Sequence, residues 1–579
     1  MRKQEHVKFN QWFATAICGN DILSSCLYVS GIAVAFGGIF APLILGVIAL
    51  VLFMYKSVYT EVVEALPING GAYNCLLNST DKTIAAIAGV TTILSYIATC
   101  VLSATVSIAY LHTLIPVPII PVTIFLLFLF AVLVILGLKD SSKIAFGIFC
   151  LHIFTLIIFV LLGSLFILSH HSFFMENLIK SKEIIQSGGG VIKALFFSFA
   201  ASLLGVSGFE SSANFVEEQE EGVFRKTLRN MLIAVAIFNP LIAIIVLGLA
   251  PISTIIAAKD FLLADQALLM GGKWLQYFIV IDAVLVLAGA VLTSFIGVSG
   301  LVYRMAADAC LPEFLTRKNS RGSYPIIIIL FFLLCSSILL LTQGNLLSLA
   351  GVYTIAFLSV MSLFALGNLI LRQTRSELKR TYSAPILFVI LAFSATFLGI
   401  IGNILIDKNN IIYFSLYFFP SVLLVLLMVY RDQLLTLILK TTPGIKPLHK
   451  FILNHYEDVT SGKIIAFVNH ANRLYEILNY IHLNETAKNV ILVHCRNWDN
   501  NVDKERFKEL NEALPFINKV GMFPNLSVSL VYENEPFGTE AINNISKKFR
   551  VRKNRIMIGS IHHFHPFEYS DLGGVRIIF

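Results

Sequence analysis

The 579-residue chain has little charge and few cysteines for its length. Asp, Glu, Lys and Arg make up 13% of the residues and hydrophobic residues make up 57%, whereas soluble domains are roughly 25% charged. The eight cysteines are scattered, mostly inside apolar segments, so the sequence predicts no disulfide framework. No strand feeds a glycine-rich phosphate loop. His562, His563 and His565 have no Cys or His partners at ligand spacing, so we expect neither a metal nor a cofactor.

Long apolar segments dominate the first three quarters of the chain. Twelve windows of about 20 mostly apolar residues are each long enough to cross roughly 30 Å of hydrocarbon. They are 10–34, 38–60, 84–112, 119–138, 144–168, 191–216, 227–251, 271–303, 325–343, 347–371, 384–406 and 411–430. The first is not a cleavable signal peptide, because polar residues interrupt it and no small-residue cleavage motif follows. The sequence predicts an all-α membrane protein with twelve transmembrane helices.

Lysine and arginine are concentrated in alternate loops. These loops carry Lys139, Lys143, Arg225, Lys226, Arg229, Arg304, Arg317, Lys318, Arg321, Arg372, Arg375, Lys379 and Arg380, and the amino terminus carries Arg2, Lys3 and Lys8. By the positive-inside rule both termini are cytoplasmic, in a plasma or inner membrane. The formal net charge of +8 follows from this bias, so we expect the lipid bilayer as a partner and no nucleic acid.

The last part of the chain has a different pattern. Short apolar runs (KIIAFV, NVILVHC, LSVSLVYE and RIMIGS) alternate with helix-like stretches such as ANRLYEILNYI. This alternation is typical of a small parallel α/β domain. We expect a transmembrane domain over 1–435, a linker over 436–460 and a cytosolic domain over 461–579. The last would be regulatory or would form a homodimer.

Two apolar segments are interrupted by small and polar residues at equivalent places in the two halves. They read FNQWFATAICGNDILSSCLYVSGIAVAF and ALFFSFAASLLGVSGFESSANFVEE. Non-helical backbone survives in a bilayer only where it lines a cavity or meets a ligand. Paired interrupted helices are the best sequence pointer to the substrate site of a secondary transporter. An enzyme would place its catalytic groups in larger interfacial loops, and nothing resembles a channel filter, so we expect a carrier and no catalytic residues.

Three strings resemble the amino acid–polyamine–organocation (APC) superfamily of permeases. They are GFESSANFVEEQEEGVFRKTLRN, VYRMAADACLPEFLTRKN and ALPINGGAYN. The resemblance implies a five-plus-five inverted repeat with broken helices 1 and 6. DILSSCLY and the plan of twelve spans plus a cytosolic α/β domain resemble the potassium importers of the Kup/Kim type. Asp21, Tyr28 and Glu210 match that branch, and Ser207 is a conservative change from its Thr, whereas Ser95 stands where those importers have an acidic residue.

The candidate substrate-binding residues lie in spans one, three and six. They are Gly19, Asn20, Asp21, Ser24, Ser25, Tyr28, Ser95, Thr99, Ser103, Ser207, Gly208 and Glu210. The missing carboxylate at Ser95 disfavours a dehydrated K⁺, while exposed N–H groups at half-helix starts suit the carboxylate of an amino acid. We expect import of an amino acid or related organic solute coupled to protons. The alternative is a proton-coupled potassium importer of the Kup/Kim type.

Buried ionisable groups are the candidates for ion coupling, because they are costly in a bilayer. Asp21 and Glu210 could share a proton, or Asp21 could instead hold the broken backbone by a hydrogen bond. His152 in span five could carry a proton near neutral pH, or could be a core histidine bonded to a carbonyl. Thr293 and Ser294 could bind Na⁺ instead. Asp282 could line the outer vestibule or lie near the hydrated interface.

Overall fold

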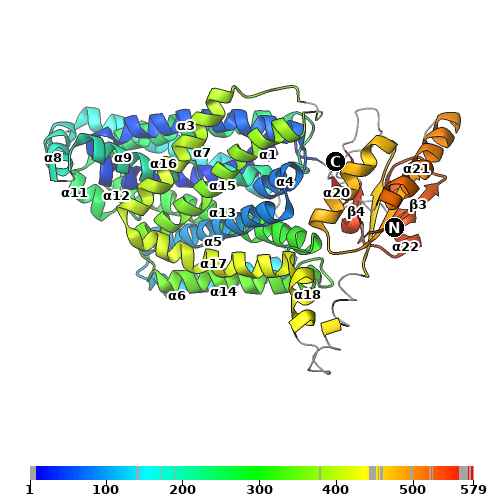
Figure 1. The fold of residues 1–579 in the computed structure, drawn as a ribbon. Coiled ribbons are helices and arrows are strands. Elements are labelled where there is room, and N and C mark those ends of the chain that lie inside the picture. Colours follow the sequence, from blue (N-terminus) through cyan, green and yellow to red (C-terminus); the bar gives the residue numbers. More distant parts are fainter. Residues whose placement is uncertain are drawn as a thin grey trace. The chain divides into compact units, whose positions relative to one another are not determined.

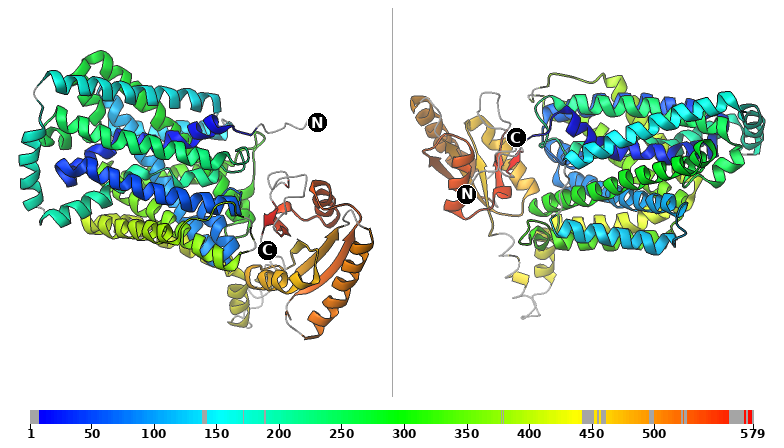
Figure 2. Two further views of the ribbon diagram at one scale, coloured as in Figure 1. Left: turned by 90° about the horizontal axis from the view of Figure 1, so that it is seen from above. Right: turned by 180° about the vertical axis from the view of Figure 1, so that it is seen from behind.

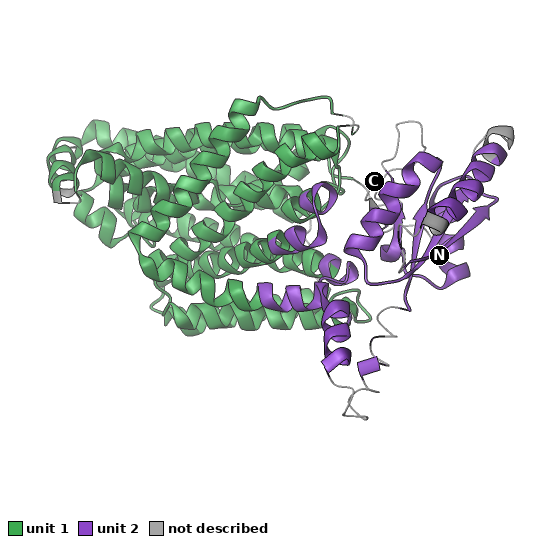
Figure 3. Cartoon of the chain, viewed as in Figure 1, with its two compact units in different colours: residues 1–75, 88–303, 314–421 green, residues 76–87, 304–313, 422–579 purple. Residues whose placement is uncertain are grey.

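The computed structural model describes most of the chain. It covers residues 8–579 except 138–141, 171, 188, 377, 379, 442–451, 454–455, 457–460, 496–499, 521–522, 524–525, 560–571, 573–574 and 578–579. The expected linker and the histidines at 562, 563 and 565 lie wholly or largely outside the described residues. The chain divides into two compact units (Figure 3): unit 1 is 1–75, 88–303 and 314–421, and unit 2 is 76–87, 304–313 and 422–579.

Unit 1 is a bundle of long helices that run roughly side by side (Figure 1; Figure 2). Its helices are α1 Gln11–Ser24, α2 Val29–Gly37, α3 Ala41–Ala65, α4 Gly71–Ser79, α5 Lys82–His112, α6 Ile119–Ile135, α7 Ser142–Ser169, α8 Phe174–Ser187, α9 Val191–Ser202, α10 Val223–Leu249, α11 Ile252–Ala257, α12 Leu262–Gly271, α13 Lys273–Ala307, α14 Pro325–Leu341, α15 Leu346–Thr374, α16 Ile386–Ile406 and α17 Lys408–Val429. Four of them, α4, α5, α13 and α17, have residues in both units. Short 3₁₀ turns η1 (Ser25–Leu27), η3 (Leu203–Val206) and η4 (Glu210–Asn214) interrupt it at two places.

Within the described residues, nine helical segments are long and apolar enough to cross a membrane. They are Val29–Ala65, Lys82–His112, Ser142–Ser169, Val191–Asn214, Val223–Leu249, Lys273–Ala307, Leu346–Thr374, Ile386–Ile406 and Lys408–Val429. Ile119–Ile135, Leu262–Gly271 and Pro325–Leu341 are shorter apolar helices. The count of twelve spans therefore stays a prediction, while a mostly helical membrane protein is what the structure shows.

Small residues let α16 approach the helix that precedes the second interruption. A Cβ atom on Gly402 would lie 2.3 Å from Ala200 Cβ, and one on Gly399 would lie 2.2 Å from Leu203 Cδ1. Asn403 Nδ2 donates to the Ala200 carbonyl at 2.8 Å. Close backbones and inter-helix hydrogen bonds hold helices together in a membrane, where hydrophobic burial supplies no driving force. This packing fixes the position of α9.

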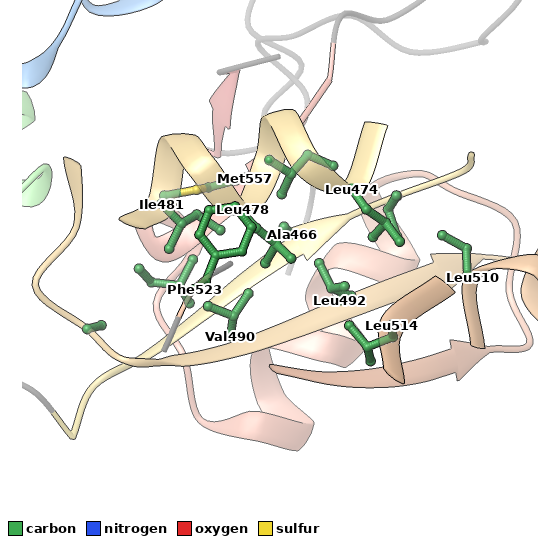
Figure 4. Packing of buried hydrophobic residues seen from close by; sticks show 14 residues of the cluster. Ala466, Leu474, Leu478, Ile481, Val490, Leu492, Leu510, Leu514, Phe523 and Met557 are labelled. Carbon is green, nitrogen blue, oxygen red and sulfur yellow. The ribbon is translucent and has the colours of Figure 1, made fainter. Parts of the chain in front are cut away.

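The carboxy-terminal part of unit 2 is a parallel sheet covered on both faces. Strands β1 (Lys463–Phe467), β2 (Asn489–Cys495), β3 (Ser527–Glu533), β4 (Ile556–Ile558) and β5 (Arg576–Ile577) have the order β3-β2-β1-β4-β5. Alternate β1 residues face opposite sides of the sheet. Ala466 packs with α20 (Leu474–Asn484) and α21 (Asn500–Val520), as Figure 4 shows. Phe467 packs on the other side with α22 (Thr539–Phe549).

Unit 2 also contains a buried ion network of Lys82, Asp308, Glu485 and Arg576. Lys82 Nζ lies 3.0 Å from Glu485 Oε1, and Arg576 Nη1 lies 2.7 Å from the same oxygen. Arg576 Nε lies 3.6 Å from Asp308 Oδ1. None of the four side chains is more than 7% exposed. Because Lys82 begins α5 and Asp308 directly follows α13, the network ties the ends of two long apolar helices to the sheet domain within unit 2.

Candidate functional site

The first interruption lies between α1 and α2. The chain is α-helical to Ser24, tightens to a 3₁₀ turn over Ser25–Leu27, and leaves helical geometry at Tyr28, where φ is −133° and ψ is −22°. Ser24 Oγ donates to the Asp21 carbonyl and Ser25 Oγ to the Ile22 carbonyl, each at 2.7 Å. Serine hydroxyls that bond back to the preceding turn often accompany a bend in a helix.

The second interruption follows α9. After the 3₁₀ turn Leu203–Val206, Ser207 is extended (φ −59°, ψ 145°), and Gly208 has a φ of +88°. This conformation favours glycine, which has no Cβ atom to clash with the backbone. The chain resumes as a 3₁₀ turn at Glu210–Asn214. Both interrupted segments predicted from the sequence thus contain backbone that is not α-helical.

The two interruptions contact one another. Ser25 Oγ lies 3.2 Å from the Gly205 carbonyl. Ser211 Oγ lies 3.0 Å from Asp21 Oδ2 and 2.7 Å from the Gly208 carbonyl, and its single proton can serve one of these acceptors at a time. A Cβ atom at position 208 would lie 2.8 Å from Asp21 Cγ. The contact therefore depends on glycine at position 208.

Two carboxylates lie at this junction. Glu210 Oε2 accepts a hydrogen bond from the Gly208 N–H at 3.0 Å, and Glu210 Oε1 accepts one from Ser95 Oγ at 3.1 Å. Asp21 and Glu210 are each 7% exposed. In the described part of the chain, neither is within ion-pair distance of a basic side chain. We call Asp21, Ser95, Gly208, Glu210 and Ser211 the break site.

Other predicted binding residues divide into two groups. Tyr28 lies beside Ser207 and close to Asp21, so those residues face the break site. Thr99 and Ser103 are buried on the same helix as Ser95, and the Thr99 hydroxyl donates to the Ser95 carbonyl at 2.8 Å. Gly19 and Asn20 instead face α7. A Cβ atom on Gly19 would lie 2.9 Å from the Phe149 ring, and Asn20 Nδ2 donates to the Ala145 carbonyl at 3.0 Å.

His152 forms a second polar site beside the first interruption. Its Nδ1 lies 2.7 Å from Asp282 Oδ2, and its Nε2 lies 3.2 Å from the Leu23 carbonyl. His152 and Asp282 are fully buried. The sequence suggested that Asp282 lines an outer vestibule or lies at a hydrated interface. The structure instead buries it fully against His152. A carboxylate and a carbonyl only accept hydrogen bonds, so only the imidazolium form of His152 donates to both.

The hydroxyls of Thr293 and Ser294 are hydrogen-bonded within their own helix. Both hydroxyls donate to the Ala290 carbonyl on their own helix, at 3.0 and 2.8 Å. Hydroxyls turned back to the helix in this way are common for serine and threonine in helices. Their predicted role as Na⁺ ligands gains no support from this geometry.

Several site residues escaped the sequence analysis. Among the described residues, the Tyr59 hydroxyl and Asn214 Oδ1 are buried without a hydrogen-bond partner, and the Tyr353 hydroxyl is buried beside Thr99. Tyr59 and Tyr353 both lie near the Glu210 carboxyl group. Asn214 Nδ2 donates to the Tyr96 hydroxyl at 2.6 Å. A tyrosine in an apolar span was the only available signal, and the sequence alone does not show which way it faces.

Replacing Gly208 by alanine is expected to lower solute uptake at least about tenfold, because the added methyl group meets Asp21 and the positive φ is strained for alanine by about 1–3 kcal/mol. Initial uptake rates in proteoliposomes check this, with Gly289→Ala as the control, since nothing lies within 4 Å of a Cβ atom there. Equal uptake by the two variants would show that the close approach at Gly208 is unimportant.

Apolar helices around two buried interruptions are those expected of an integral, multi-pass membrane protein, and the comparisons with known proteins place the chain among permeases. The family described as "Amino acid permease" matches residues 9–429. The chain belongs to this family.

Known proteins resemble parts of the chain. The branched-chain amino acid permease BcaP of Bacillus subtilis (strain 168) is 24% identical over 260 residues. That match covers 44% of this chain and 52% of BcaP, so the chain spans about half the length of this relative. A crystal structure of a manganese transporter mutant from Eremococcus coleocola has a TM-score of 0.47 at 13% identity, covering 72% of this chain and 93% of that one.

Proposed function

We propose that the protein imports an amino acid or a related amino compound by proton-coupled alternating access. The observation that carries this proposal is the pair of buried carboxylates, Asp21 and Glu210, at touching interruptions of two helices. Ionisable groups buried in a membrane are expensive and mark substrate or proton pathways. We further propose twelve spans in a five-plus-five inverted repeat, with both termini and the α/β domain in the cytosol.

Solute binds at the break site, between spans one and six. The bundle of spans one, two, six and seven then rocks against spans three, four, eight and nine. In this plan His152 lies on span five and Asp282 on span eight, while Leu23 lies on span one. Protonated His152 therefore links span one, through the Leu23 carbonyl, to span eight, through Asp282. Loss of the proton leaves His152 with one donor for two acceptors, so the Leu23 contact breaks while the hydrogen bond to Asp282 remains.

Proton coupling is tested with His152→Gln and Asp282→Asn in proteoliposomes. We expect an inward proton gradient to accelerate uptake of a labelled amino compound at least about fivefold in the unmodified protein. In both variants that acceleration is expected to disappear, while slow uptake without a gradient persists. Glu176→Gln, an exposed change on α8, serves as the control. Uptake that responds to Na⁺ but not to protons would refute the coupling through His152.

The α/β domain has a separate proposed role. We propose that it regulates transport or joins two protomers, since the transport groups lie in the apolar helices. Its attachment to α5 and α13 through the ion network gives it a means of acting on those helices. We propose no bound nucleotide for this role, because no strand feeds a glycine-rich loop in the sequence.

A further inference from the structure

Three basic side chains converge where α3 packs beside α10. Lys56 lies on α3, and Arg225 and Arg229 lie in the first two turns of α10. Lys56 is close enough to both arginines for their positive charges to repel its own. We call these three residues the cation cluster. It lies on the side of the bundle that we propose to be cytosolic.

The cation cluster has no acidic side chain within ion-pair distance among the described residues. The two acidic residues of α3 that follow Lys56 are bound elsewhere. Glu61 accepts a hydrogen bond from Arg372 Nε at 2.8 Å, and Glu64 accepts one from a backbone N–H, that of Tyr382, at 2.9 Å. Ionisable residues within membrane spans are costly and usually pair with an opposite charge. The cation cluster therefore favours an anionic ligand.

The amino terminus of α10 adds to this preference for an anion. The first N–H groups of an α-helix lack partners within the helix and together carry a partial positive charge. Helix α10 begins at Val223 after Gly222, and no side chain caps it. Arg225 stands in this first turn, so its guanidinium and the helix dipole both attract negative charge.

Apolar side chains continue from the cation cluster along the surface that faces lipid. On α10, Arg229, Ile233 and Ile237 follow at four-residue steps, which places them on one side of the helix, and all three are exposed. On α3, Phe53 is exposed, and its ring centroid lies 5.8 Å from Lys56 Nζ. A soluble anion would use the charges alone, whereas a lipid would also cover this apolar surface.

We propose that the cation cluster binds the phosphate group of an anionic phospholipid, whose acyl chains lie along Phe53, Ile233 and Ile237. Basic groups between helices at the cytosolic boundary suit anionic headgroups, which are concentrated in that leaflet. Phosphatidylglycerol has this chemistry, because no ammonium group neutralises its phosphate, whereas phosphatidylcholine carries such a group. None of the three basic residues belongs to the break site, so the inference does not depend on the identity of the solute.

The test is a lipid titration of the purified, delipidated full-length protein, followed by native mass spectrometry. The probes are dioleoyl phosphatidylglycerol, dioleoyl phosphatidylcholine and glycerol 3-phosphate, and the quantity measured is the dissociation constant of the first ligand bound. We expect phosphatidylglycerol to bind at least about tenfold more tightly than phosphatidylcholine. Lys56→Gln and Arg229→Gln are each expected to weaken phosphatidylglycerol binding about fivefold. Lys56→Arg, which keeps the charge, should retain it, as should Lys143→Gln, which changes an exposed lysine at the start of α7.

Three results would overturn the inference. Equal affinity for the two lipids would show that the charges contribute nothing to binding. Unchanged affinity for phosphatidylglycerol in both glutamine variants would place the lipid elsewhere on the protein. Glycerol 3-phosphate that binds as tightly as phosphatidylglycerol would indicate a site for a soluble anion. Arg229 is exposed, so Arg229→Gln is expected to fold and to provide the test if Lys56→Gln does not.

Discussion

Asp21→Asn is expected to lower the initial rate of solute uptake by about ten- to a hundredfold. Asparagine keeps the size of the side chain and an oxygen for the Ser211 hydroxyl, which lies 3.0 Å from Asp21 Oδ2. It loses the negative charge that a buried ammonium or proton needs. Hydrogen bonds to charged groups contribute about 1.5–3 kcal/mol, and each 1.4 kcal/mol corresponds to about tenfold.

The matched control for this prediction is Glu176→Gln, which removes a carboxylate from an exposed position on α8. Both variants are reconstituted in equal amounts, and uptake is measured over the linear phase. If Asp21→Asn transports as fast as the control, the carboxylate does not bind substrate or proton. Asp21 would then serve only to hold the broken backbone through its carbonyl and the Ser24 hydroxyl.

Glu485→Gln is expected to lower the opening free energy of the α/β domain by about 3–5 kcal/mol. This is the usual consequence of removing one partner from a buried ion pair. Arg576 and Lys82 would lose the negative charge of the carboxylate to which both are bonded. Hydrogen–deuterium exchange of β5 and α20 in the full-length protein measures the change in opening free energy. The exposed change Glu540→Gln on α22 is the control, and equal exchange in the two variants would argue against a stabilising network.

The same network predicts an acid dependence. Burial alone raises the pKa of Glu485, but Arg576 and Lys82 outweigh it and lower that pKa from 4.5 to about 2. A carboxyl group with a folded-state pKa below its unfolded value stabilises the fold above the unfolded pKa. This stabilisation is expected to be lost as the pH falls from about 4.5 towards 2. In Glu485→Gln the exchange of β5 should lack that component of its pH dependence.

The sequence revealed the break site because the bilayer makes polar residues conspicuous. Asp21, Ser207 and Glu210 stand in mostly apolar segments, and burying them requires partners. Ser95 was expected to lie there only through the resemblance to a known family, and its hydroxyl does donate to Glu210. The sequence does not show which way a side chain of a helix points. A tyrosine in a span, such as Tyr353, can face either lipid or protein.

Helix phase explains why Gly19 and Asn20 lie elsewhere. From the sequence, all polar residues of the interrupted stretch were expected to line the substrate site. The chain nevertheless remains α-helical through Ser24. Successive residues on such a helix point about 100° apart, so residues 19 and 20 face α7 while Asp21 faces the second interruption. Asp282 was judged by its depth alone, and its contact with His152, 130 positions earlier, could not be seen in a single sequence.

The first four strands of the carboxy-terminal sheet could be predicted from the sequence, but the fifth could not. The four apolar runs expected to form strands overlap β1, β2, β3 and β4. Strand β5, Arg576–Ile577, has two residues and pairs with β4 at the edge of the sheet. A strand of that length carries no period-two pattern, so tertiary pairing alone defines it.

Counterflow tests the central claim of a carrier with its site at the two interruptions most directly. Proteoliposomes are loaded with an unlabelled solute that the protein transports, then diluted into a trace of the labelled solute without any ion gradient. We predict a transient accumulation of label above the external concentration, and its loss in Asp21→Asn. Label that rises only to equilibrium in the unmodified protein would contradict alternating access and indicate a channel.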